Sequence, residues 1–151
     1  MRGFSMVESL VALVVLSVGL LGIATLFIEG MSGNRSAICR AQAVQLAADL
    51  AERIRANRQA GTGYSLGPGG GPLLQSCITA AAGCSPLALA QEDLSRWLVA
   101  VHDTLPGDGV HTPSGTVAVN TGTRPFTYTI TIRWSEPGVP ALLSHVLEIR
   151  A

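Results

Sequence analysis

The chain has 151 residues, of which 48% are hydrophobic and only 13% are charged. Ten arginines balance ten acidic residues, lysine is absent, and the net charge at pH 7 is zero. This balance gives no reason to expect nucleic acid as a partner, and the length allows one small domain beside a membrane segment.

The N-terminal segment combines one carboxylate with a long apolar run. Glu8 directly precedes residues 9–28, which carry no charge. About 20 residues at 1.5 Å rise per residue match the roughly 30 Å hydrocarbon core of a bilayer, so the run predicts a membrane-spanning helix. A carboxylate at the edge of the hydrocarbon is costly and normally indicates a function with a positive partner nearby. Cleavage after Gly3 would create an amine on Phe4, one helical turn from Glu8.

Gly3, Phe4 and Glu8, together with the apolar run, resemble the class III signal of type IV pilins and pseudopilins. In that family a short basic leader ends in glycine, the mature chain begins with phenylalanine, and its fifth residue is glutamate. The resemblance implies that prepilin peptidase cleaves between Gly3 and Phe4 and that the new N-terminus on Phe4 is methylated. It also implies that Glu8 acts in assembly by neutralising the N-terminal amine of an adjacent subunit.

Two other interpretations of this segment are weaker. A secretory signal peptide has an apolar core of about 7–15 residues and then a small-residue cleavage site, whereas this run is longer and no such site comes after it. A plain single-span anchor explains the length but not Glu8. Arg35 and Arg40 lie beyond the span, and the positive-inside rule would place the C-terminal domain in the cytoplasm. The resemblance requires the opposite orientation, and the cysteine content favours it because disulfides need an oxidising compartment.

Residues 35–59 predict an amphipathic helix that continues the span. Gly30 and Gly33 weaken the junction by about 1 kcal/mol each relative to alanine. We expect one long spine after a leader of residues 1–3, with residues 4–28 as its membrane and assembly half and residues 29–60 as its amphipathic half. The apolar stripe repeats at helical spacing and includes a cysteine, expected to act as a small buried hydrophobic side chain: Cys39, Ala43, Leu46, Ala47, Leu50 and Ile54.

Residues 61–85 predict a connector followed by a disulfide loop. Residues 61–72 contain six glycines and two prolines, so we expect neither helix nor strand there. Cys77 and Cys84 then flank six residues. A disulfide between them is the favoured interpretation and would contribute about 2–3 kcal/mol. A metal pair is the alternative, although the spacing is unlike that of zinc sites and no second pair exists.

Residues 86–151 predict a globular head that begins with a helix. Ser85-Pro86 is typical of a helix start and Pro106-Gly107 of a stop. Residues 93–98 and 105–107 also resemble the region before the sheet in the PilV family of type IV pilus minor pilins. The apolar side chains of this helix repeat at helical spacing: Leu94, Trp97, Leu98, Val101 and Leu105.

The last third of the chain predicts three strands. Residues 116–120 form a short strand, residues 126–134 alternate between apolar and polar side chains, and residues 143–149 alternate in the same way. Short connections predict an antiparallel meander. The expected fold is α+β and pilin-like: a long N-terminal helical spine packed under a small head with a second helix and a three-stranded antiparallel sheet.

The sequence contains no recognisable catalytic pattern, and we expect no enzyme activity, no cofactor and no metal site. Motifs for a nucleophilic serine, a phosphate loop or a zinc protease are missing. Glu92 and Asp93 are adjacent on a helix and so face different directions. Asp103 and Asp108 could hold calcium, but their spacing alone is a weak signal. The histidines are scattered over a helix end, a loop and a strand: His102, His111 and His145.

The resemblance implies a minor pilin of a type IV pilus, held in the inner membrane by a single span with a periplasmic head and later part of the extracellular fibre. Such a subunit supports pilus biogenesis, adhesion and twitching motility. The implied partners are prepilin peptidase, other minor pilins, the major pilin and a tip adhesin. Two alternatives are a minor pseudopilin of a type II secretion system, which shares the signal and the fold, and a membrane-anchored periplasmic binding domain.

Overall fold

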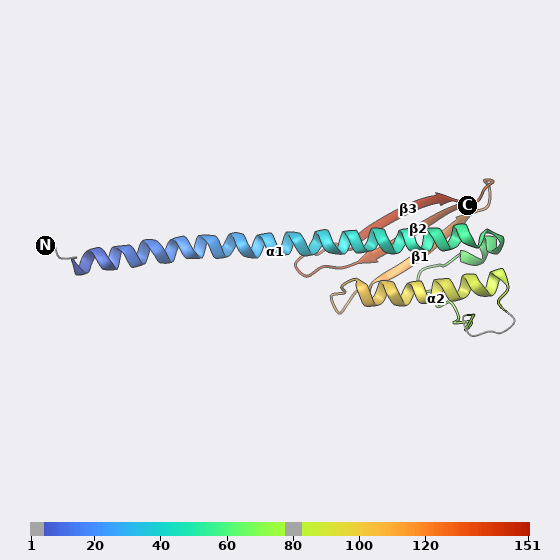
Figure 1. Ribbon diagram of the computed structural model, residues 1–151, viewed down its shortest axis with the longest axis horizontal. Coiled ribbons are helices and arrows are strands. Elements are labelled where there is room, and N and C mark those ends of the chain that lie inside the picture. The colour runs from blue at the N-terminus through green and yellow to red at the C-terminus, as the bar shows by residue number, and fades with distance from the viewer. Residues whose placement is uncertain (1–4, 78–82) are drawn as a thin grey trace. The chain divides into compact units, whose positions relative to one another are not determined.

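A computed structural model describes residues 5–77 and 83–151. The chain divides into two compact units, Met1–Ile38 and Cys39–Ala151. The α+β class expected from the sequence is confirmed. The elements are arranged along the chain in this order (Figure 1): α1 (Met6–Ala56), the 3₁₀ helix η1 (Arg58–Tyr64), α2 (Pro86–Thr104), β1 (Ser114–Asn120), β2 (Thr127–Trp134) and β3 (Leu143–Arg150).

The first unit consists of the N-terminal part of α1. The helix continues through Gly30 and Gly33, and it is long and apolar enough to cross a membrane. Two hydroxyl groups inside the apolar run bond back to the helix. Ser17 Oγ donates to the Val14 carbonyl at 2.8 Å, and Thr25 Oγ1 donates to the Leu21 carbonyl at 3.0 Å. These hydroxyls therefore do not depend on water, which suits an apolar environment.

The second unit has a core built on the remaining part of α1. Five of the six residues predicted for the apolar stripe are buried, and Leu46 packs against them as a partly buried neighbour. Ala51 joins the stripe, although the sequence did not single it out. The helix ends at Ala56, three residues before the end predicted at residue 59.

The sheet of the second unit has the strand order β1-β2-β3, and both pairs are antiparallel. Ile130 lies opposite Val117 on β1 and opposite Leu147 on β3. The predicted alternation is confirmed from Tyr128 to Trp134, because Tyr128, Ile130, Ile132 and Trp134 are all buried. Phe126, predicted to start the strand, precedes β2 and is only partly buried. The meander expected from the sequence is therefore present.

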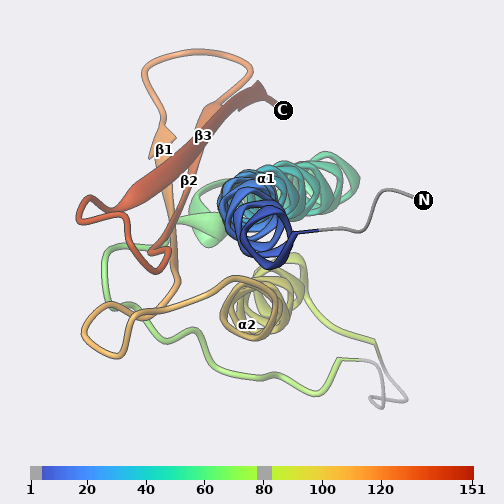
Figure 2. The same ribbon diagram turned by 90° about the vertical axis from the view of Figure 1, so that its left-hand side faces the viewer.

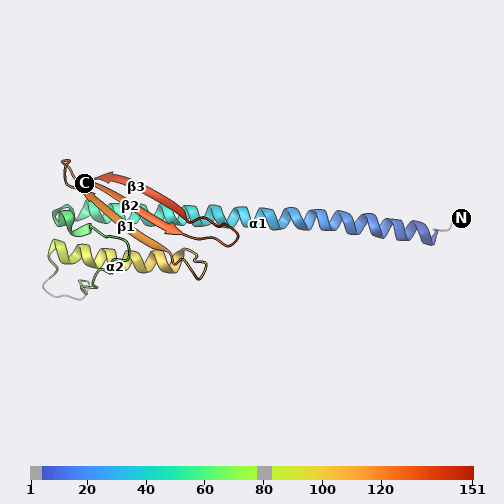
Figure 3. The same ribbon diagram turned by 180° about the vertical axis from the view of Figure 1, so that it is seen from behind.

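Helix α2 runs antiparallel to the part of α1 that it accompanies and covers a different side of α1 from the sheet (Figures 1, 2 and 3). Its predicted start is confirmed, since Ser85 Oγ accepts a hydrogen bond from the Ala88 N–H with Pro86 in the first turn. Trp97 Nε1 donates to the Leu46 carbonyl at 2.9 Å and so ties α2 to α1. In the second unit, α1, α2 and the sheet therefore pack around one apolar core.

The expectation that residues 61–72 contain neither helix nor strand is wrong for their first half. η1 extends through Tyr64, whose side chain is fully buried. Leu66 is also buried, and it forms a one-residue antiparallel bridge with Val117 on β1, with both N···O distances at 2.9 Å. Burying one tyrosine and one leucine side chain stabilises this segment by about 1.5–3 kcal/mol each, enough to oppose the local effect of glycine.

Candidate functional site

Glu8 lies in the first turn of α1 and is exposed. A negative charge there is favoured by the helix dipole, whose positive end lies at the N-terminus. In the described part of the chain Glu8 has no ion pair or hydrogen bond through its side chain. Gly3 and Phe4, which the sequence predicts to flank a cleavage site, lie outside the described residues. The described part of the site is therefore a single carboxylate in the first turn of an apolar helix.

The surface of α1 beyond Glu8 is apolar and uncovered. Residues 9–28 carry no charge, and the large apolar side chains from Met6 to Met31 are between 57% and 87% exposed. Contiguous exposed apolar surface on this scale normally marks contact with a membrane or with other proteins. The fold of the second unit does not use these side chains. Their covering must come from outside the chain.

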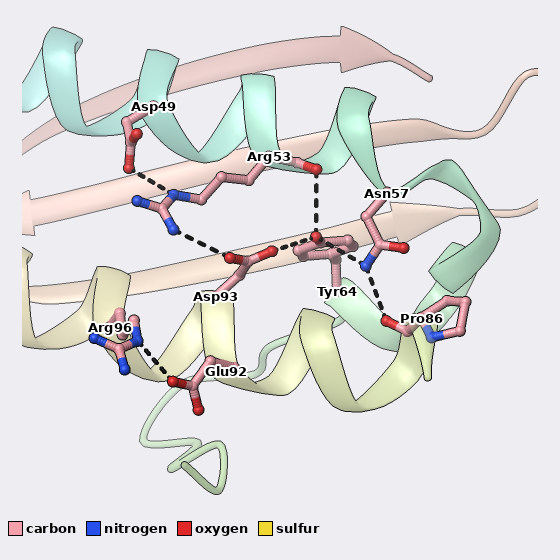
Figure 4. A network of polar contacts seen from close by, with 8 residues as sticks. All are labelled: Asp49, Arg53, Asn57, Tyr64, Pro86, Glu92, Asp93 and Arg96. Carbon is pink, nitrogen blue, oxygen red and sulfur yellow. Dashed lines mark hydrogen bonds and ion pairs between the residues drawn. The ribbon is translucent and has the colours of Figure 1, made fainter. Parts of the chain in front are cut away.

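The second unit contains a buried polar network between α1, η1 and α2 (Figure 4). Asp93 is 8% exposed, and its carboxylate accepts hydrogen bonds from Tyr64 Oη at 2.7 Å and from Arg53 at 3.1 Å. Arg53 also bonds to Asp49 at 2.9 Å. Burial and the hydrogen bond to Asp93 raise the pKa of Tyr64 above its ordinary value. The network holds three elements together through one carboxylate.

Glu92, the residue before Asp93 on α2, forms a separate contact. Its carboxylate accepts hydrogen bonds from the backbone N–H groups of Gln75 at 2.7 Å and Ser76 at 2.9 Å, and from Arg96 at 2.6 Å. Burial alone would raise the pKa of Glu92, but these three hydrogen bonds hold it below its ordinary value. Glu92 thus ties the segment before the disulfide to α2.

The structure confirms that Glu92 and Asp93 face different directions, as their adjacent positions predict (Figure 4). Sequence reasoning did not find that both carboxylates are buried. For Glu92 a signal was present, because Arg96 lies four residues later on the same helix. For Asp93 no local signal exists, since its partners come from α1 and η1. These two residues act in structure and do not converge on a cavity.

Cys77 and Cys84 form a disulfide with a Cα–Cα distance of 5.5 Å, as the favoured interpretation of their spacing predicts. Cys39 is buried at the start of the second unit, in the predicted apolar stripe, and is not part of this disulfide.

The structure does not bring the three histidines together. His102 lies 3.4 Å from Asp103 on α2, His111 lies 3.0 Å from Asp108 in a loop, and His145 lies on β3. The His111 side chain, with the backbone N–H groups of His111 and Val110, lowers the pKa of Asp108 to about 2. Asp108 is thus already engaged within its own loop. Among the described residues no group of three potential metal ligands occurs.

Two comparisons with protein families match adjacent parts of the chain. Residues 1–24 match the prokaryotic N-terminal methylation motif. Residues 25–95 match the Tt1218-like family, described as type IV pilin Tt1218. Together they cover the N-terminal segment, all of α1 and η1, and the first half of α2. Comparisons with curated proteins and with solved structures find no match.

Proposed function

We propose that this chain, which belongs to the type IV pilin family, is a minor pilin that is anchored in the inner membrane and later built into a pilus. One observation carries the proposal: Glu8 lies in the first turn of a helix whose large apolar side chains are more than half exposed from Met6 to Met31. The Cys39–Ala151 unit has a core of its own, so this surface is available for lipid and then for other subunits.

The role proposed for Glu8 derives from the chemistry of an apolar environment. A carboxylate surrounded by lipid or by apolar helices requires a positive partner. A processed N-terminal amine of an adjacent subunit supplies such a charge at the start of α1. Pairing the two would fix the register between neighbouring helices, because an unpaired charge in the fibre core is costly.

The proposed processing precedes assembly. The match of residues 1–24 to the N-terminal methylation motif supports cleavage by prepilin peptidase between Gly3 and Phe4, followed by methylation of the Phe4 amine. The span then holds the subunit in the inner membrane with its head in the periplasm. The disulfide between Cys77 and Cys84 is consistent with that side of the membrane.

The minor-pilin assignment rests on the resemblance of residues 93–98 and 105–107 to the PilV family. In this role the chain acts as a structural subunit without catalysis. Its partners are the major pilin, other minor pilins and a tip adhesin, and it supports pilus biogenesis, adhesion and twitching motility. The presence of Glu8 favours a position below the outermost tip, because the terminal subunit has no neighbour above it whose amine needs neutralising.

The test is to shear fibres from cells, purify them, and sequence the N-terminus of this chain in the fibre and membrane fractions. We expect Phe-Ser-Met-Val-Glu in both fractions, with the chain present in fibres at a low ratio to the major pilin. The variant Gly3→Val should remain uncleaved and stay in the membrane.

Each alternative outcome would assign the chain to a different class of protein. A mature N-terminus beyond Ile28 would mean a secreted protein, and an uncleaved chain confined to the membrane would mean a plain anchor. Absence from pilus fibres together with a requirement in type II secretion would identify a pseudopilin. Presence as the most abundant fibre subunit would identify a major pilin.

A further inference from the structure

A pocket of about 250 Å³ lies in the second unit between α1 and the strands β2 and β3. Helix α1 contributes two lining residues, and the strands contribute the others. Its lining combines a guanidinium and an imidazole with apolar walls: Arg40, Val44, Trp134, Leu143, Ser144 and His145. The two basic groups distinguish this pocket from the uncharged surface of residues 9–28.

The two basic side chains of the pocket have no acidic partner. Within residues 5–77 and 83–151, neither Arg40 nor His145 takes part in a hydrogen bond or an ion pair through its side chain. Other arginines of the same unit are engaged, since Arg53 bonds to two carboxylates and Arg96 bonds to Glu92. Arg40 and His145 thus carry several N–H donors that have no acceptor among the described residues, and both residues line the same pocket.

The acid that lies near the pocket is already engaged. Glu136 is 6% exposed, and it accepts a hydrogen bond from Trp134 Nε1 at 2.9 Å. This bond uses the only polar atom of the Trp134 side chain, so the ring offers apolar surface to the pocket.

His145 lies opposite Ile132 in the sheet, on the side of β3 that faces the core. This pairing fixes the position on the strand from which the imidazole projects.

These features favour a carboxylate that carries an apolar stem. A guanidinium binds a carboxylate through two parallel N–H donors, and a histidine ring N–H adds a third. The volume lies below the roughly 300–1,000 Å³ typical of small-molecule sites, yet one acidic side chain fits within it. Val44 is 49% exposed and Arg40 is exposed, so the pocket opens at a surface that another protein can reach.

We infer that this pocket receives an acidic side chain, aspartate or glutamate, from a neighbouring pilin subunit in the fibre. The inference rests on the proposed function, because it takes its occupant from the assembled pilus. It adds a contact in the head that is separate from Glu8. The pairing places an unpartnered positive charge of one subunit against a negative charge of the next, which favours the correct partner and register.

The absence of lysine from the chain gives a direct test. In fibres assembled with an Arg40→Lys variant, a carbodiimide will join the introduced amine to a carboxylate within contact distance. Mass spectrometry of the digested fibres should show an amide between position 40 and an aspartate or glutamate of another subunit. The matched control is Arg133→Lys, which places the same amine at an exposed position of β2 on the opposite face from Trp134.

Three results would overturn the inference. The first is that no amide forms at position 40, and the second is that position 40 forms an amide only with an acid of the same chain, such as Glu136. The third is that Arg133→Lys gives as much cross-link between subunits as Arg40→Lys. A second measurement is incorporation of Arg40→Gln into fibres, which should fall about fivefold, as expected for one charged pair at a partly exposed interface. Arg133→Gln should enter fibres normally.

Comparison with Glu8→Ala separates the two proposals. If Glu8→Ala is lost from fibres while Arg40→Gln enters them normally, the proposed function stands and the carboxylate pocket fails. If Glu8→Ala also enters normally, the proposed assembly function itself fails.

Discussion

The two ends of α1 carry the same kind of side chain in opposite environments. Leu20 is 58% exposed, whereas Leu50, thirty residues later in the same helix, is fully buried. Helix geometry and residue type are the same at both positions, so the difference comes from what surrounds them. The Cys39–Ala151 unit completes a core by itself. In the Met1–Ile38 unit the large apolar side chains from Met6 to Met31 are more than half exposed, as on surfaces that contact a membrane or other proteins.

Charged groups differ between the two units in the same way. Residues 5–38 carry three charged side chains, Glu8, Glu29 and Arg35, and none of them forms an ion pair among the described residues. In the second unit Asp93 and Glu92 are buried, and each is held by several hydrogen bonds. The two buried carboxylates of the second unit therefore act in its folding, whereas Glu8 and Glu29 of the first unit are exposed and have no such role.

The largest contrast is expected from leucine substitutions in the two parts of α1. Leu50→Ala removes a fully buried side chain and should lower the free energy of unfolding of the second unit by about 2–5 kcal/mol. Leu20→Ala should leave it unchanged. Urea unfolding of the full chain in detergent, followed by tryptophan fluorescence, measures both, because Trp97 and Trp134 are buried in the second unit. Equal effects would mean that the two parts of α1 do not differ as described.

A smaller contrast is expected between two aspartates that bond to the same arginine. Asp93→Ala leaves Tyr64 and Arg53 without their buried acceptor and should cost about 1.5–3 kcal/mol in the same unfolding experiment. Asp49→Ala removes an exposed partner of Arg53 and should cost less than about 1 kcal/mol. If Asp49→Ala costs as much as Asp93→Ala, burial is not what gives the network its strength.

The smallest effect is expected in how the stability of the second unit depends on pH. The pKa of Glu92 is lower in the folded chain than in the unfolded chain. Its contribution to stability is therefore complete above the unfolded value of about 4.3 and is lost as pH falls through the lower folded pKa. Unfolding midpoints measured from pH 7 downward should fall less steeply in Glu92→Gln than in the wild type. Glu148→Gln, at an exposed position on β3, is the control and should match the wild type.

The features that could be predicted from the sequence are those set by local periodicity. Three such features are local patterns. The stripe from Cys39 to Ile54 repeats every three to four residues, the apolar side chains of β2 repeat every two residues, and Ser85-Pro86 marks the start of α2. Each pattern reports on one element alone, and so it needs no knowledge of the partner.

The features that could not be predicted depend on residues far apart in the chain. Tyr64 and Leu66 are buried although their neighbours are glycines, because α2 and β1 supply their contacts. A Cβ at Gly115 would lie 2.3 Å from the Trp97 ring, so glycine is required there by a residue on another element. Local propensity carries no information on such contacts.

The sequence identified Glu8 but not the pocket in the second unit. Glu8 was identified by one charge against a long apolar run, and the structure places it exposed in the first turn of α1. The pocket at Arg40 and His145 was not identified, because its lining comes from α1, β2 and β3 and no motif links them.

The central claim is that Glu8 acts in assembly and not in folding. The measurement is the ratio of fibre-associated to membrane-retained protein for the wild type, Glu8→Ala and Glu29→Ala, which removes the other carboxylate of the same exposed helix part. A stranded amine in an apolar fibre core costs about 3–5 kcal/mol, so the ratio for Glu8→Ala should fall by about a hundredfold or more. Cleavage and urea unfolding of this variant should match the wild type, and Glu29→Ala should keep the wild-type ratio. An unchanged ratio for Glu8→Ala, or an equal loss for Glu29→Ala, would contradict the claim.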